Sequence, residues 1–132
     1  MNRPAFTITR FATTADGGSR FEELVVPLSE TRTDEFGNRL PLTPPLSVTN
    51  VALVELPVGL DQDWHNAPNR QLVMVLTGTV EVETTDGEVR RSGPGSLFMA
   101  DDTTGKGHRT RVIGGPAKLV FVRLPDDFRF PG

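Results

Sequence analysis

Short apolar runs alternate with turn-forming residues along most of the 132-residue chain. The runs are rich in valine, leucine, phenylalanine and threonine, and thirteen glycines and eleven prolines punctuate them, which is typical of strands joined by turns. No stretch carries the i, i+3, i+4, i+7 spacing of a long amphipathic helix. The pattern predicts an all-β fold with little helix, with strands at residues 21–28, 47–56, 72–76, 79–83, 96–100 and 119–124.

Two connections stand out between these runs. The pair Asp86-Gly87 separates two alternating segments, and both residue types accept the positive φ of tight turns, so we expect a hairpin there. Residues 31–45 carry glycine, asparagine and three prolines and are expected to form a long loop outside the core. Such a loop can cover a pocket mouth, although an inert surface excursion is the commoner case.

Length and composition restrict the function classes. The chain has the length of one domain, expected as N-terminal strands and a loop over 1–46, a barrel core over 47–124 and a C-terminal tail over 125–132. A net charge of −3 with scattered charges argues against nucleic acid or an anionic membrane as a partner. The absence of cysteine excludes disulfides, thiolate nucleophiles and cysteine-ligated zinc. Without a secretion signal or an apolar run of membrane-spanning length, the cytosol is the expected compartment.

One polar motif precedes the strand predicted at 72–76. It contains Gly59, His65, Gln71 and, after the strand, Gly78. Because alternate residues of a strand face the same side, and the next strand returns to the same place, this spacing predicts a convergence of polar side chains. The only other histidine, His108, follows a glycine-rich turn containing Gly105. We therefore predict a polar site inside the barrel at His65, Gln71 and His108.

The spacing of both motifs resembles that of the cupin superfamily, in particular its small single-domain members. In that family a glycine, His-x-His, a glutamate and a second glycine form the first motif, and a histidine lies in the second. The resemblance covers about residues 57–122. It implies a double-stranded β-helix, a jelly-roll-like barrel of two antiparallel sheets, with N-terminal strands covering or extending one sheet, and it implies a homodimer.

The chain also departs from the family pattern. Ala67 replaces the second histidine, Gln71 replaces the glutamate, and Thr103 and Val112 stand at the proline and asparagine positions of the second motif, whose opening glycine is displaced to Gly95. The metal ligands that remain are two imidazoles and one amide oxygen. This set can hold Fe(II), Mn(II), Ni(II) or Zn(II), more weakly than the complete site. Asp63 has the strand parity to supply a fourth ligand, but a surface carboxylate is the commoner explanation.

Three functions remain open at this point. The leading one is a small-molecule enzyme of the cupin type, with His65, Gln71 and His108 around a divalent metal, acting as an oxygenase, isomerase, lyase or cyclase. The second is a metal-free cyclase, dehydratase or isomerase in which a histidine moves protons. The third is a binding or sensing module without turnover. In the last two, the histidines and the Gln71 amide bind one another or a neutral polar ligand.

The surroundings of this site can also be anticipated. Strand parity places Val73, Val75 and Thr77 in the interior beside Gln71, which makes the pocket mainly apolar. Trp64 should point away from the pocket and have a structural role. Charged residues around the second glycine-rich turn are expected to be solvated, although any of them can reach the mouth, and the same ambiguity applies to Arg70. These residues are Asp101, Asp102, Lys106, Arg109 and Arg111.

Two further readings are excluded. Gly93-Pro94-Gly95 lacks the helix and lysine of a phosphate-binding loop, so a turn is expected there. No serine has the sequence context of a nucleophile, so a serine hydrolase is not supported.

Overall fold

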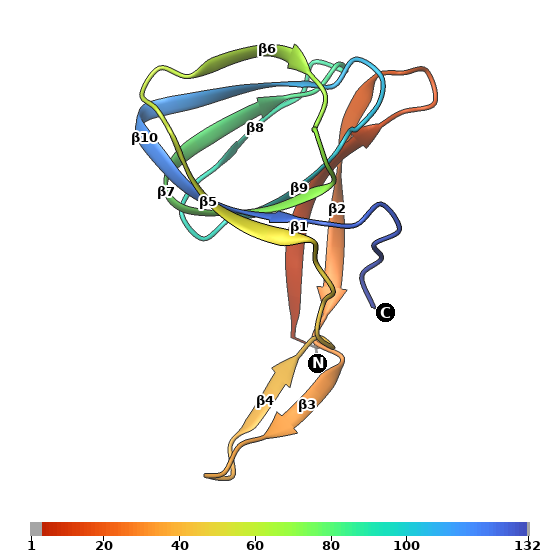
Figure 1. Ribbon diagram of the computed structural model, residues 1–132, viewed down its shortest axis with the longest axis vertical. Coiled ribbons are helices and arrows are strands. Elements are labelled where there is room, and N and C mark those ends of the chain that lie inside the picture. Colours follow the sequence, from red (N-terminus) through yellow and green to blue (C-terminus); the bar gives the residue numbers. More distant parts are fainter. Residues whose placement is uncertain (1–3, 132) are drawn as a thin grey trace.

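Ten β-strands and no helix make up the computed structural model, which describes residues 4–131 (Figure 1). Within these residues there is thus no helix of a length and hydropathy that would cross a membrane. The strands are β1 (Ala5–Thr13), β2 (Ser19–Pro27), β3 (Glu30–Thr33), β4 (Arg39–Leu42), β5 (Asn50–Leu56), β6 (Asp61–His65), β7 (Gln71–Glu83), β8 (Val89–Ser92), β9 (Leu97–Asp101) and β10 (His108–Arg123).

Two long strands, β7 and β10, build the barrel by passing through both of its sheets. Their segments 71–77 and 118–123 lie in a sheet of order β2-β1-β9-β7-β10-β5, whereas 79–83 and 109–113 pair with each other between β8 and β6. The predicted runs at 72–76 and 79–83 are therefore one bent strand. The expected extension of one sheet by N-terminal strands is confirmed, but β1 pairs in parallel with β9, while the other pairs are antiparallel.

A glycine permits the bend of β7. Gly78 has a φ of +82°, and a Cβ there would lie 2.6 Å from the Pro116 carbonyl oxygen and 2.7 Å from the Ala117 Cα. At the same corner β10 takes an extra excursion between Ile113 and Lys118, where the register shifts. Both strands thus turn together at the left of the barrel in Figure 1.

The corner also reverses which residues of β7 face inward. Val73 and Val75 are buried before it, and Val80 and Val82 are buried after it. Thr77 lies at the bend and is exposed, so its predicted interior position is wrong. A side chain adjoining a sharp corner leaves the alternation of the regular strand, and strand parity alone does not reveal this.

Apolar residues fill two layers. The inner cluster lies between the sheets and includes Phe11, Phe21, Val73, Phe98 and Leu119. A second cluster forms on the outer face of the larger sheet, where the tail of the chain packs against Ile8, Val26, Met99 and Val122 through the buried Phe128. The two aromatics of the tail thus dock on the barrel of their own chain.

The hairpin at Asp86-Gly87 is confirmed as the connection of β7 and β8, with a different turn from that expected. Gly87 has a φ of +87°, and none of the other residue types has a positive φ in the part of the chain described. Asp86 instead accepts hydrogen bonds from the Thr84 hydroxyl and the Glu88 amide through Oδ1. The connection between the two strands therefore has five residues, 84–88, with one glycine in the left-handed conformation, and the Thr84 amide closes it by donating to the Glu88 carbonyl oxygen at 3.0 Å.

The expectation of a loop over 31–45 is wrong in part, because strands β3 and β4 form a hairpin there. The hairpin remains outside the core, as expected, and projects away from the barrel beyond the β1–β2 pair (Figure 1). Its two strands do not alternate between apolar and polar residues, because nearly all of their side chains are exposed. The sequence therefore carries no strand signal there, and Pro41 argues against a strand. It does not cover the barrel mouth.

Candidate functional site in the barrel mouth

A cavity of about 400 Å³ opens at the barrel end opposite the corner. Its walls are mainly apolar, with Phe11, Leu56, Ala67, Pro68, Val73, Val80, Val82, Phe98, Ala100, Leu119 and Phe121. The polar residues of its lining are Gln62, His65, Asn66, Gln71, His108, Thr110 and Arg123. His65, Gln71 and His108 thus line one cavity, in agreement with the convergence expected from their spacing.

The bend of the long strands explains the convergence. Gln71 is the first residue of β7 and His108 the first residue of β10, and both strands turn back near their middle. Their four ends therefore meet at one mouth. The register places His65, at the end of β6, directly opposite His108, and Arg123, at the end of β10, directly opposite Gln71.

The two imidazoles are neighbours. The ring centroids of His65 and His108 are 4.4 Å apart, with an angle of 53° between their planes. His108 is 5 % exposed, and Phe11 covers its ring from β1 at a centroid distance of 4.7 Å. His65 is half-buried and lies nearer the mouth. A small molecule in the cavity can therefore contact both rings.

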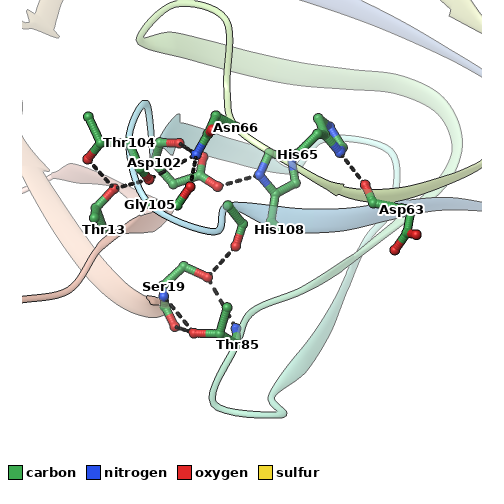
Figure 2. Close-up of polar contacts among 11 residues, drawn as sticks. Thr13, Ser19, Asp63, His65, Asn66, Thr85, Asp102, Thr104, Gly105 and His108 are labelled. Atoms are coloured by element: carbon green, nitrogen blue, oxygen red, sulfur yellow. Dashed lines mark hydrogen bonds and ion pairs between the residues drawn. The ribbon is translucent and has the colours of Figure 1, made fainter. Parts of the chain in front are cut away.

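Hydrogen bonds fix the tautomer of each ring (Figure 2). The Nδ1 atom of His65 lies 2.7 Å from the Asp63 carbonyl oxygen, and that of His108 lies 2.5 Å from Asp102 Oδ2. A carbonyl and an ionised carboxylate only accept hydrogen bonds, so each Nδ1 carries a proton and donates it. The Nε2 atoms have no hydrogen-bond partner in residues 4–131 and are left as the reactive nitrogens.

Asp102 is the principal site residue that sequence reasoning missed. Its side chain is completely buried and holds His108, so the expectation of a solvated carboxylate is wrong. Asp101 is also largely buried, between Arg10 and Arg70. The nearby glycines and charged residues resemble an ordinary surface turn, and no spacing rule links the aspartate to the histidine six positions later. Only the three-dimensional path of the turn reveals the contact.

Gln71 provides a third polar group in the lining of the same cavity. It is 6 % exposed, and its Oε1 is buried with no hydrogen-bond partner in the described residues. An unpartnered buried oxygen costs free energy, so the Gln71 oxygen still lacks a hydrogen-bond donor or a cation. A donor or a cation brought by a ligand would satisfy it.

A close contact between backbones sets the separation of the two histidines. Gly107, directly before His108, has a φ of +83°, and a Cβ there would lie 1.9 Å from the His65 carbonyl oxygen. The Ser19 hydroxyl donates to the Gly107 carbonyl oxygen at 2.6 Å, and the Asn66 amide donates to the carbonyls of Thr104 and Gly105 at 2.9 Å each. Figure 2 shows the bonds from Asn66 to Thr104 and Gly105 in this turn.

The remaining candidates lie outside the cavity. The Asp63 side chain is 89 % exposed, so it is a surface carboxylate and offers no ligand to the interior. Trp64 does not line the cavity, and its ring lies beneath the Lys106 amine, 4.8 Å from it. Arg70 binds Asp101 and donates to the carbonyls of Asp126 and Phe128, which fastens the tail. Arg70 is therefore structural.

The donor set can be compared with the needs of a divalent metal. Each imidazole has its Nδ1 proton on an oxygen acceptor, which is the arrangement typical of histidine ligands, and Gln71 has a free buried oxygen. No group of three histidine, aspartate or glutamate side chains suited to a metal occurs within residues 4–131. By type alone, two imidazoles and one amide oxygen make a neutral, weakly binding donor set without a carboxylate.

No protein-family model and no curated protein matches the chain. It is similar to solved structures of a Neisseria meningitidis protein (22 % identity, 61 % of this chain and 84 % of that chain, TM-score 0.47) and of a double-stranded β-helix protein from Klebsiella pneumoniae (20 %, 67 % and 83 %, 0.45). A third is an RmlC-like cupin protein from Desulfovibrio desulfuricans (19 %, 73 % and 91 %, 0.41).

These superpositions are partial, so the assignment of the fold rests on the chain itself. Two long strands pass through both sheets, the motif glycine Gly78 lies at their corner, and both motif histidines meet at the opposite mouth. The meeting of the histidines is what the motif spacing predicted, whereas the bend of both strands was not predicted. The chain is therefore a small all-β domain with a double-stranded β-helix barrel.

Proposed function

We propose that the chain is a small-molecule enzyme that transfers protons with the paired imidazoles of His65 and His108. The observation that carries this proposal is the buried hydrogen bond from His108 Nδ1 to Asp102, which fixes the ring with Nε2 unoccupied at an apolar cavity. A positioned imidazole of this kind is suited to general acid–base catalysis near neutral pH. Isomerisation, dehydration and cyclisation are the reaction classes that proton transfer alone can drive.

In this proposal the residues have distinct roles. His108 Nε2 removes a proton from a carbon of the bound molecule. His65, after taking up a proton from solvent at Nε2, donates that proton at a second atom or to a leaving hydroxyl, and His108 then releases the abstracted proton to solvent. Asp102 is a positioning residue, because it holds the tautomer and the orientation of His108. Gln71 binds a polar group of the substrate, and the apolar walls exclude water.

A divalent metal is the second candidate, favoured by the occupied Nδ1 atoms of both rings and by the free Gln71 oxygen. His65, His108 and Gln71 would hold it, and a bound metal would polarise a substrate oxygen. The metal content of the protein separates the two candidates. It is measured on protein purified without a histidine tag after growth with Fe, Mn, Ni and Zn supplied. Stoichiometric metal supports the metal enzyme, and persistent absence supports proton transfer by the imidazoles alone.

Catalysis is tested by incubating a metabolite extract with the protein in deuterated water and following deuterium uptake by mass spectrometry. We expect compounds that gain deuterium with the wild-type protein and lose this gain with His108→Ala. Asp63→Ala, on the surface, is the matched control and should behave as wild type. Equal deuterium uptake by His108→Ala, His65→Ala and the wild type would exclude proton transfer at this site, and no uptake at all would favour a binding module.

A further inference from the structure

We propose that the substrate carries one carboxylate and that Arg123, with Gln71, binds it. This inference concerns the cavity of the proposed function and names the chemical class that the cavity selects. It rests on the charge, partners and register of Arg123, which the proton-transfer argument does not use.

The charges of the cavity are unbalanced. Arg123 is the one lining residue whose side chain is always charged, and no aspartate or glutamate is among the lining residues described. Other arginines of the barrel, including Arg10, Arg70, Arg91 and Arg111, bind carboxylates of the chain itself. By contrast, the side chain of Arg123 donates only to the neutral Asn50 Oδ1, at 3.1 Å, among residues 4–131.

The position of Arg123 in the sheet places its charged side chain in the cavity lining, where a ligand would bind. It faces Gln71 directly across the β7–β10 pair, and opposite residues of neighbouring strands point to the same face. Both side chains line the cavity. A guanidinium binds a carboxylate through two parallel hydrogen bonds, and the NH2 group of the Gln71 amide can add a further donor. The unpartnered Gln71 Oε1 is an acceptor, so it would take a donor group of the ligand and not the carboxylate itself.

The rest of the cavity defines the body of the substrate. A volume of about 400 Å³ lies towards the small end of the range for ligand pockets. Phe98, Leu119 and Phe121 make the walls apolar, so a compact hydrocarbon or aromatic body fits best. One unpaired cation matches one anionic group. The site is therefore suited to a small monocarboxylate rather than to a phosphate ester or a dicarboxylate.

Binding of simple probes tests this inference directly. Benzoate and cyclohexanecarboxylate are titrated into the protein, with benzamide and cyclohexanecarboxamide as neutral analogues of the same shape, and cavity amides are followed by NMR. We expect each carboxylate to bind about tenfold or more tightly than its amide, because a charge-assisted pair in an apolar cavity is replaced by neutral hydrogen bonds. Equal affinities, or no shift at cavity residues with either carboxylate, would overturn the inference.

Two substitutions assign the effect to Arg123. Arg123→Gln should weaken carboxylate binding about tenfold or more while amide binding is unchanged, and Arg123→Lys should give an intermediate value. Arg39→Gln, on the exposed β4, is the control and should bind as wild type. Unchanged carboxylate affinity in Arg123→Gln would refute the role of this residue.

The two proposals fail separately. His108→Ala should keep the carboxylate preference and lose deuterium uptake. If His108→Ala retains uptake while Arg123→Gln loses binding, proton transfer is wrong and carboxylate recognition stands. The reverse result leaves proton transfer and removes carboxylate recognition.

Discussion

Asp102 and Asp63 lie on either side of the paired imidazoles and hold them in different ways. Asp102 accepts from His108 through its carboxylate, whereas Asp63 accepts from His65 through its backbone carbonyl. The Asp63 side chain can therefore be removed without loss of the His65 hydrogen bond. At the level of single residues, burial decides which carboxylate matters.

This difference gives a prediction for a matched pair of variants. Asp102→Ala should lower the free energy of unfolding by about 1–3 kcal/mol, because the buried His108 Nδ1–H loses its acceptor. Asp63→Ala should change it by less than about 0.5 kcal/mol, as is usual for exposed positions. Urea denaturation of both variants measures the effect. Equal stabilities would mean that the Asp102 hydrogen bond contributes nothing to the fold.

The sequence predicted the site residues better than it predicted their supports. His65, Gln71 and His108 follow a fixed spacing on strands, so strand parity and the return of the next strand bring them together. Asp102 and Arg123 have no such signal, because their roles depend on how a turn folds back and how far a long strand continues past its corner. The same corner explains the wrong interior position of Thr77.

At the scale of elements, glycines with positive φ shape the two ends of the barrel. Gly78 allows β7 and β10 to bend together, and Gly107 allows the turn before β10 to touch the end of β6. The strands at 21–28, 47–56 and 96–100 were predictable from their apolar residues. The β3–β4 hairpin and β6 were not, because exposed polar strands lack that signal.

Gly107 can be tested against a glycine of the same conformation in open space. Gly95 has a φ of +87° and no atom near its missing Cβ, so Gly95→Ala should cost only the left-handed backbone, about 1–2 kcal/mol. Gly107→Ala adds overlap with the His65 carbonyl, for about 1–3 kcal/mol more. Thermal unfolding compares the two variants. A Gly107→Ala protein as stable as Gly95→Ala would show that the contact is not required.

At the scale of the whole molecule, the two sheets have outer faces of different character. The outer face of the sheet β2-β1-β9-β7-β10-β5 is apolar and is partly covered by the tail. The outer face of the opposite sheet, formed by β8, residues 79–83 of β7, residues 109–113 of β10 and β6, carries ion pairs. Glu81 is central to the latter, since it accepts from Arg91 at 2.9 Å and from Arg111 at 2.8 Å. The homodimer implied by the family resemblance stays a prediction.

The ion pairs of Glu81 predict how stability depends on pH. Hydrogen bonds from Arg91 and Arg111 hold the pKa of Glu81 below its ordinary value. A carboxyl with a lowered pKa in the folded state stabilises the protein above its unfolded pKa, about 4.3, and loses this contribution as the pH falls through the folded value. Glu81→Gln should therefore be less stable than wild type at neutral pH, with the difference shrinking in acid. A difference independent of pH would contradict this account.

The proposed site consists of two imidazoles that line the cavity and whose Nδ1 atoms are held by oxygen acceptors. The most direct measurement is NMR of the protein labelled with nitrogen-15 in its two histidines, at neutral pH. Both rings should be found as Nδ1–H tautomers, with His108 changed to a mixture or to the other tautomer in Asp102→Ala. Rings that exchange between both tautomers, or that carry the proton on Nε2, would contradict the proposed site.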